Sequence, residues 1–309
     1  MRQALLLLLV ILFCLPASAD LADRFSALTK PHGLKVGVAF IDLKSGQELT
    51  INGTAEFPTA SVGKIPVMAA AYALAEKGEI NLETKVPYGP QDKLGGSGIL
   101  QWTKFGRYYS LRRLISLMIT RSDNTATKMV INNVGLDKIG QFLETRGFSN
   151  IVIADPTMLR EPPLKNRNLA TPLEMAHLVG RIEKRDGFSE ASAAEMLKYM
   201  SNQVYRWGLW QGVPPGTKIA DKTGNLTSIL NDVGIVYTRS GNYVLAIFTN
   251  GFTMKKNARL LVNKLSQAAY EEYTGEKVVF PKPVKKKIIT KKRWPKKRVY
   301  RKTRTTKRR

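Results

Sequence analysis

The sequence has very little cysteine and histidine, and this excludes several kinds of catalytic site. The single cysteine, Cys14, lies in an N-terminal segment that we expect to be removed, so the mature chain would have no disulfide, thiolate nucleophile or thiolate metal site. The two histidines, His32 and His177, are too few for the usual zinc site, and a serine triad needs a histidine beside its serine. We expect no metal and no organic cofactor.

Acidic residues are absent from the C-terminal end of the chain. Of the formal charge of +25, the segment Lys277–Arg309 contributes 17 Lys and Arg and no Asp or Glu, so the rest of the chain carries +8. Dense like charge interrupted by prolines predicts a disordered tail. Such a segment is either a solvated tail without a specific partner or a polyanion-binding one.

No apolar run is long enough to cross a membrane, because a spanning helix needs about 20 residues. The run Ala4–Leu15 follows Arg2 and precedes Ala17-Ser18-Ala19, which is typical of a cleaved signal peptide over residues 1–19. A membrane anchor is the alternative, and a lipoprotein signal at Cys14 is disfavoured by the bulky Phe13. We therefore expect an exported protein, periplasmic or secreted.

The body of the chain has strand patterns at its two ends and helix patterns between them. Strands are predicted over Leu34–Leu43 and Gln47–Asn52, and again over Lys218–Lys222, Ile229–Tyr237 and Tyr243–Asn250. Helices are predicted over 21–29, 61–78, 110–119, 124–133, 136–146, 172–184, 189–199 and 255–273. We expect an α/β (α+β) fold with an antiparallel sheet built from both chain ends, flanking helices and an inserted all-helical subdomain. A ligand cleft is expected where the two parts meet.

Three short motifs carry candidate chemistry. In Ser61-Val62-Gly63-Lys64 a serine opens a helix, and Lys64 on the same face can take its proton if burial lowers the pKa of the amine. The others are Ser122-Asp123-Asn124, between two helices, and Lys222-Thr223-Gly224, at the end of a strand. Each alone has an ordinary interpretation, as a helix cap, a turn or a strand end.

Together, in this order, the three motifs form a known catalytic set. Over about residues 22–273 the sequence resembles the class A β-lactamase and penicillin-binding-protein superfamily of serine hydrolases. The segments 57–60, Gly95–Leu100 and Thr171-Pro172 agree with this resemblance, whereas the tail has no counterpart in the family.

The resemblance implies roles for individual residues. Ser61 would be acylated by an amide carbonyl, with Lys64 as general base, directly or through water. Ser122 would pass a proton to the leaving nitrogen with help from Lys222, which would also attract the substrate carboxylate. Asn124 would hold the substrate's side-chain amide. The substrate site would also include Thr223, Gly224 and Asn225, and the backbone N–H groups of Ser61 and Asn225 would form the oxyanion hole.

Whether the acyl group is released by water depends on Glu161. Glu161 and Leu164 resemble the family's Glu-x-x-Leu-Asn, but Lys165 stands where the asparagine is expected. Neither Arg206 nor Arg239 stands at the family's carboxylate-binding position. The main hypothesis is a β-lactamase; the alternatives are a peptidoglycan D,D-peptidase or related serine hydrolase, and a non-catalytic envelope-binding module.

The predicted organisation has three parts. They are a signal peptide over 1–19, a catalytic domain over 20–275 (sheet part about 20–60 and 205–275, helical part about 61–204) and a basic tail over 276–309. The substrate would be a small β-lactam or a molecule like a peptidoglycan stem, and the protein a monomer. Export makes nucleic acid an unsuitable partner for the tail, so we expect electrostatic contact with anionic envelope polymers or lipid headgroups.

Overall fold

A five-stranded antiparallel sheet joins the two ends of the described chain. The computed structural model describes residues 17–158 and 167–279. The strands are β1 (Val36–Asp42), β2 (Glu48–Ile51), β7 (Lys218–Asn225), β8 (Leu230–Tyr237) and β9 (Asn242–Thr249). They lie in the order β2-β1-β9-β8-β7, and each neighbouring pair is antiparallel. The predicted fold class is confirmed.

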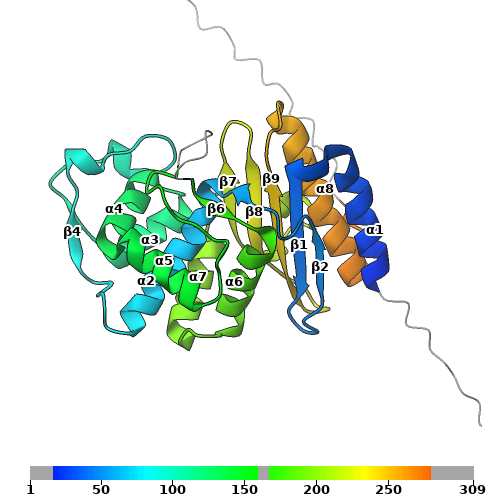
Figure 1. Ribbon diagram of the computed structural model, residues 1–309, viewed down its shortest axis with the longest axis horizontal. Coiled ribbons are helices and arrows are strands. Elements are labelled where there is room, and N and C mark those ends of the chain that lie inside the picture. The colour runs from blue at the N-terminus through cyan, green and yellow to red at the C-terminus, as the bar shows by residue number, and fades with distance from the viewer. Residues whose placement is uncertain (1–16, 159–166, 280–309) are drawn as a thin grey trace, which may run out of the picture. The chain divides into compact units, whose positions relative to one another are not determined.

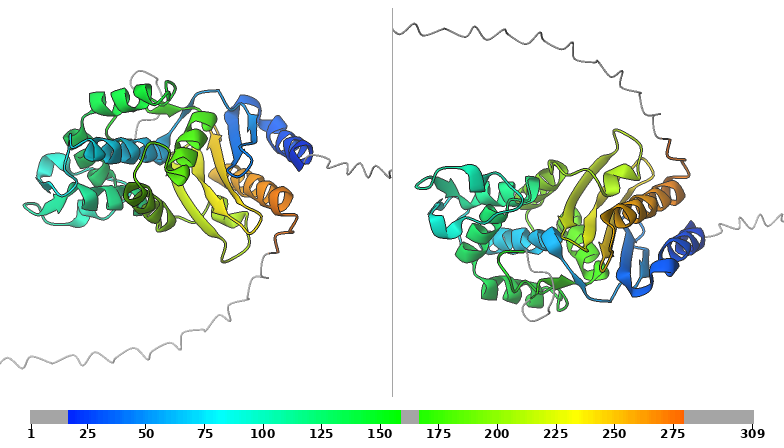
Figure 2. Two further views of the ribbon diagram at one scale, coloured as in Figure 1. Left: turned by 90° about the horizontal axis from the view of Figure 1, so that it is seen from below. Right: turned by 90° about the horizontal axis from the view of Figure 1, so that it is seen from above.

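Helices cover both faces of this sheet (Figures 1 and 2). Successive side chains of a strand point to opposite faces: Val36, Val38 and Phe40 belong to one apolar cluster, whereas Ala39 and Ile41 belong to the other. The first cluster lies under α1 (Ala17–Thr29) and α8 (Lys255–Thr274), and the second lies under α6 (Pro172–Lys184).

The helical part is built around one buried helix. All residues of α2 (Lys64–Glu76) from Lys64 to Leu74 are buried, so this helix is apolar on every side except where Lys64 lies. Around it stand α3 (Leu111–Thr120), α4 (Asn124–Val134), α5 (Leu136–Thr145) and α7 (Glu190–Ser201). Two small two-stranded antiparallel sheets complete this part, β3 (Phe57–Pro58) with β6 (Leu169–Ala170) and β4 (Lys85–Pro87) with β5 (Tyr108–Ser110). The 3-10 turns are η1 (Lys30–Lys35), η2 (Ala60–Gly63), η3 (Pro90–Asp92), η4 (Leu100–Trp102) and η5 (Leu209–Gln211).

The predicted elements differ from the observed ones in three respects that affect the site. The helix expected from Ser61 begins at Lys64, because residues 60–63 form the 3-10 turn η2. The strand expected to end at Lys222 continues to Asn225, because residues 223–225 still pair with β8. The two small two-stranded sheets were not predicted.

No helix within the described residues combines the length and the apolar character needed to cross a bilayer. The described residues, 17–158 and 167–279, belong to one compact unit.

Candidate active site

Ser61 lies in the turn that leads into α2, and the backbone before it is held in place. Asn231, fully buried on β8, donates hydrogen bonds from Nδ2 to the carbonyl oxygens of Pro58 (2.8 Å) and Thr59 (3.1 Å). Ala60, directly before the serine, has a φ of +47°, which is unfavourable for a residue with a Cβ. The chain is thus fixed directly before the bend at Ala60, and Ser61 follows this bend partly exposed.

Lys64 is fully buried and its amine makes three hydrogen bonds. Nζ lies 2.8 Å from the carbonyl oxygen of Ser122, 3.1 Å from Ser122 Oγ and 2.8 Å from Asn124 Oδ1. The expected direct hydrogen bond from Lys64 to the Ser61 hydroxyl is not present among the described residues. The reason is local: Ser61 belongs to the 3-10 turn, while Lys64 is the first residue of α2 and points toward the turn before α4.

The segment Ser122–Asn124 is fixed by its central carboxylate. Asp123 caps α4 by accepting from the backbone N–H of Ala126, and its second oxygen accepts from the N–H groups of Ile99 (2.6 Å) and Leu100 (2.8 Å). Ser122 has a φ of +50°, a strained conformation that turns its side chain between two lysines.

The neighbouring loop is fitted closely to this carboxylate. Gly98 has a φ of +106°, and a Cβ at that position would overlap Asp123 Cγ and Cα. Asn124 donates from Nδ2 to the carbonyl oxygen of Gly95 at 3.0 Å. The predicted segment Gly95–Leu100 therefore supports the second motif directly.

Lys222 reaches the same hydroxyl from the opposite side. It is fully buried on β7, and its Nζ donates to Ser122 Oγ (3.1 Å) and to the carbonyl oxygen of Thr223 (2.7 Å). Gly224, two residues on, lies against the nucleophile's turn: a Cβ there would be 3.0 Å from the carbonyl oxygen of Thr59 and 3.2 Å from the backbone N of Ser61. The structure thus brings the three motifs together, with Ser122 Oγ between two amines.

Burial sets the protonation of these amines. It lowers the pKa of Lys64 well below 10.5, with a further lowering by the charge of Lys222 and an opposing effect of Asp123. Burial also lowers the pKa of Lys222, to about 8, although Asp221 and Asp232 oppose it. A neutral Lys64 has two N–H donors for its two carbonyl acceptors and a lone pair for the Ser122 hydroxyl. A proton can therefore pass between Lys222 and Lys64 through Ser122.

Two buried carboxylic acids, Asp221 on β7 and Asp232 on β8, lie near Lys222. Asp221 accepts from Gln203 Nε2 (2.6 Å) and Trp210 Nε1 (2.9 Å), and Asp232 accepts from the N–H of Leu209 (2.8 Å). Burial raises the pKa of both groups, and the charge of Asp221 raises that of Asp232 further. The negative charges of Asp221 and Asp232 stabilise the protonated form of Lys222 and so oppose the lowering of its pKa by burial.

One site residue was missed in the sequence. Lys255, at the start of α8, donates from Nζ to Asn225 Oδ1 at 2.9 Å in an exposed position. It is a cation beside the predicted substrate residues, whereas Arg206 stacks on Trp210 and Arg239 follows the far end of β8. The contact joins residues 30 positions apart, so no local pattern could have revealed it.

Of the other predicted site residues, some lie within the described chain and some lie outside it. Asn225 is the last residue of β7, and Thr223 is buried. Glu161, Lys165 and Leu164 lie outside the described residues, so the structure says nothing of them. No group of three His, Cys, Asp or Glu arranged for a metal occurs in residues 17–158 and 167–279.

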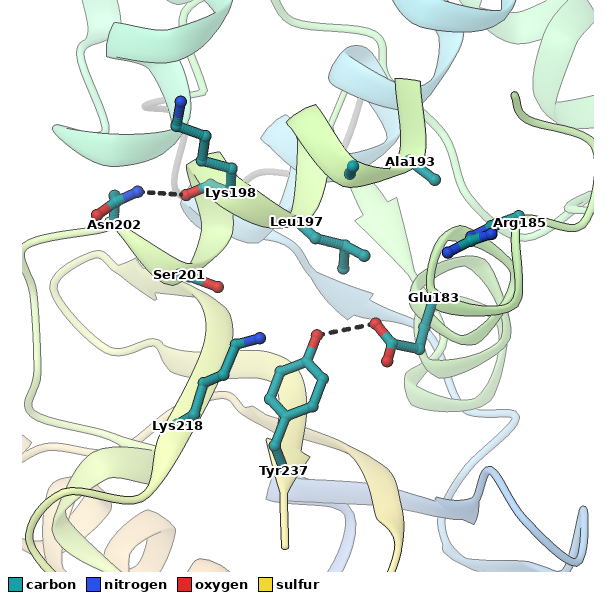
Figure 3. Close-up of a pocket in the computed structure, with 10 residues that line it drawn as sticks. Glu183, Arg185, Ala193, Leu197, Lys198, Ser201, Asn202, Lys218 and Tyr237 are labelled. Carbon is teal, nitrogen blue, oxygen red and sulfur yellow. Dashed lines mark hydrogen bonds between the residues drawn. The ribbon is translucent and has the colours of Figure 1, made fainter. Parts of the chain in front are cut away.

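A groove of about 460 Å³ lies between α7 and the start of β7, at the end of the strand opposite to Gly224 and Asn225 (Figure 3). Tyr237 donates to Glu183 Oε2 at 2.8 Å across it, and Lys218 Nζ lies 4.3 Å from the centre of the Tyr237 ring. The groove contains none of the motif residues, so the cluster around Ser122 remains the candidate active site.

This fold is a sheet between two helical layers, and it carries a buried cluster of Ser122 with two lysines. Both features are typical of a class of serine hydrolases. A family model described as the β-lactamase enzyme family matches residues 20–273, and the chain belongs to this family. β-Lactamase VEB-1 of Pseudomonas aeruginosa is 25% identical over 261 residues, which cover 79% of this chain and 87% of that protein.

Solved structures agree with this family. The β-lactamase of Sphaerobacter thermophilus superposes with a TM-score of 0.77 at 29% identity, covering 84% of this chain and 99% of that one. A variant of PBP-A, solved as an acyl-enzyme complex with penicillin G, has a TM-score of 0.76 at 28% identity and covers 84% and 97%. The chain is therefore a β-lactamase-family hydrolase.

Proposed function

We propose that the protein hydrolyses β-lactam amides through a serine acyl-enzyme. The observation that carries the proposal is the convergence of Lys64 and Lys222 on Ser122 Oγ, at 3.1 Å each, beside the turn that holds Ser61. Ser61 Oγ would attack the lactam carbonyl carbon, the C–N bond would break, and the released nitrogen would take a proton from Ser122. Water would then hydrolyse the ester and free Ser61.

The protonation states support this sequence of steps. A neutral Lys64 can accept the proton of Ser61, directly or through water, because burial lowers the pKa of its amine. A protonated Lys222 can resupply Ser122 below a pH of about 8. The same charge, with Lys255 at the mouth, would attract the carboxylate of the substrate.

The acyl group must then be released from Ser61 by an activated water molecule. We assign this step to Glu161, which would activate the water. The alternative is a D,D-peptidase-like enzyme that stays acylated by penicillin. The reason to test that alternative is Lys165, which stands in place of the family's asparagine.

A chromogenic cephalosporin and intact-mass measurement separate these possibilities. We expect steady turnover by the unmodified protein, no acylation of Ser61→Ala, and accumulation of the acyl-enzyme in Glu161→Ala. Ser240→Ala, which removes a hydroxyl from the exposed β8–β9 turn, is the matched control and should behave like the unmodified protein. A single acylation without turnover would establish the D,D-peptidase-like alternative, and no acylation would contradict both.

We also propose that the protein is exported and that its tail contacts anionic envelope polymers or lipid headgroups. The support is the signal-like segment 1–19 and the 17 basic residues of Lys277–Arg309. Fractionation of cells that express the full chain or a form ending at Gly275 tests the idea. Equal retention of both forms in the envelope fraction at moderate salt would refute the role of the tail.

A further inference from the structure

A loop of the helical part exposes several large apolar side chains together. Within residues 99–108, which we call the aromatic loop, the side chains of Ile99, Trp102, Phe105 and Tyr108 are 44%, 80%, 45% and 65% exposed. Scattered single apolar residues are normal on a surface, but here four large ones are exposed within ten consecutive residues, and exposed apolar side chains gathered in this way are typical of contact sites. The loop follows η3 and leads into β5, at the end of the helical part remote from α1 and α8 (Figures 1 and 2).

This exposure belongs to an ordered loop. Its first residues are fixed by the Asp123 carboxylate, which accepts from the N–H of Ile99. The Phe105 ring packs against the buried Tyr88, with 5.1 Å between ring centres, and the backbone of Tyr88 exchanges hydrogen bonds with Gly106 and Arg107. The apolar side chains are therefore presented to solvent by a preformed support.

The exposed charge of the segment that contains the loop is basic, because the flanking Asp92 and Asp123 are buried. Residues 93–122 include six basic residues and no Asp or Glu: Lys93, Lys104, Arg107, Arg112, Arg113 and Arg121. Within the described chain, ion pairs of this segment involve only Arg112. Lys104 and Arg107, in the loop itself, are exposed and unpaired.

We propose that the aromatic loop docks the protein on an anionic lipid bilayer. Trp and Tyr favour the boundary between headgroups and hydrocarbon, since each has an apolar ring and a polar atom, and Ile99 and Phe105 add apolar area that can enter the acyl chains. Lys104 and Arg107 would lie at the headgroups of anionic lipids. The loop would hold the protein at the membrane surface, whether or not the proposed activity is correct.

Other occupants fit the loop less well. A second copy of the chain would bring two unneutralised basic surfaces together. A neutral polysaccharide could stack on the exposed rings, but it carries no anionic group for Lys104 and Arg107. The lipid surface matches both the apolar side chains and the charge.

The test must separate the loop from the two other membrane-active segments. The protein is therefore used from Asp20 to Arg309, without the apolar run Ala4–Leu15, and with Trp294→Phe to remove the indole of the tail. Vesicles of phosphatidylcholine, with or without phosphatidylglycerol, carry bromine on their acyl chains. Bromine quenches only an indole that enters the hydrocarbon, so electrostatic binding by the tail gives no signal.

We expect quenching of the Trp102 fluorescence by vesicles with phosphatidylglycerol, and loss of this signal in Trp102→Phe. Lys104→Gln/Arg107→Gln should show much weaker quenching by such vesicles at low salt, a readout to which binding by the tail does not contribute. The control pair Met254→Ser/Leu260→Ser, which changes exposed apolar residues at α8, should bind like the parent.

Two results would overturn the proposal. One is the absence of Trp102 quenching in every vesicle. The other is sedimentation with isolated peptidoglycan that depends on Trp102 while the vesicles leave its fluorescence unchanged, which would assign the loop to the wall polymer.

Discussion

Replacing Lys222 by methionine should make the protein more stable at neutral pH and less stable at alkaline pH. In the folded protein burial lowers the pKa of Lys222 from 10.5 to about 8. Below pH 8 the amine is charged in both the folded and the unfolded state, so folding buries a charge. The pKa difference corresponds to a cost of about 3 kcal/mol.

The sign of the pH dependence follows from proton binding. Between about pH 8 and 10.5 the unfolded chain keeps the Lys222 proton while the folded protein releases it, so the free energy of unfolding rises with pH. Lys222→Met removes both the cost and the rise. It also leaves the carbonyl oxygen of Thr223 without its partner, which costs about 1–2 kcal/mol at any pH.

The difference in the free energy of unfolding between Lys222→Met and the parent should change sign with pH. At about pH 7 the variant should be more stable than the parent by about 1–2 kcal/mol, and at about pH 10 less stable by about 1 kcal/mol. Urea unfolding followed by circular dichroism at both pH values measures the difference. Lys218→Met, at the exposed start of the same strand, is the control and should show no such change with pH. A difference for Lys222→Met that is the same at both pH values would refute the reasoning.

Three further substitutions test the supports of the site. Asn231→Ala removes the side-chain donor of the Pro58 carbonyl oxygen and the side-chain acceptor of the Thr249 N–H in the core, while the Thr59 carbonyl oxygen keeps its bond from Val62 N–H. It should lower the free energy of unfolding by about 2–4 kcal/mol in urea titrations, and an effect below about 1 kcal/mol would contradict the account. Gly98→Ala forces a Cβ into Asp123 and should lower the rate of acylation by penicillin in stopped-flow measurements, an unchanged rate being the contrary result. Lys255→Met should raise KM for substrates that carry a carboxylate by about tenfold and change kcat little, and a loss confined to kcat would argue against a binding role.

Local patterns predicted most of the fold. Helix boundaries came close because capping residues mark them: Thr171 and Ser189 accept from the N–H groups of Glu174 and Ser192 at the starts of α6 and α7. β3 and β6 have two residues each, too few for any periodicity, so no pattern could predict them.

The sequence predicted which residues form the site better than it predicted the contacts between them. Motif order named Ser61, Lys64, Ser122 and Lys222, and the structure brings the last three into one hydrogen-bonded chain. Spacing suggested a direct contact of Lys64 with Ser61, but spacing describes a regular helix and the serine lies in a 3-10 turn. Contacts across the fold, such as that of Asn231 with the segment before the nucleophile, depend on tertiary packing that no local pattern encodes.

The most direct test of the central claim is the intact mass of the protein during reaction with penicillin. The account predicts a transient mass increase equal to that of one penicillin, located on the peptide that contains Ser61, and decaying as product accumulates. Ser61→Ala should show neither the adduct nor the product. Hydrolysis that persists in Ser61→Ala, or an adduct on a different residue, would contradict the assignment of Ser61 as the nucleophile.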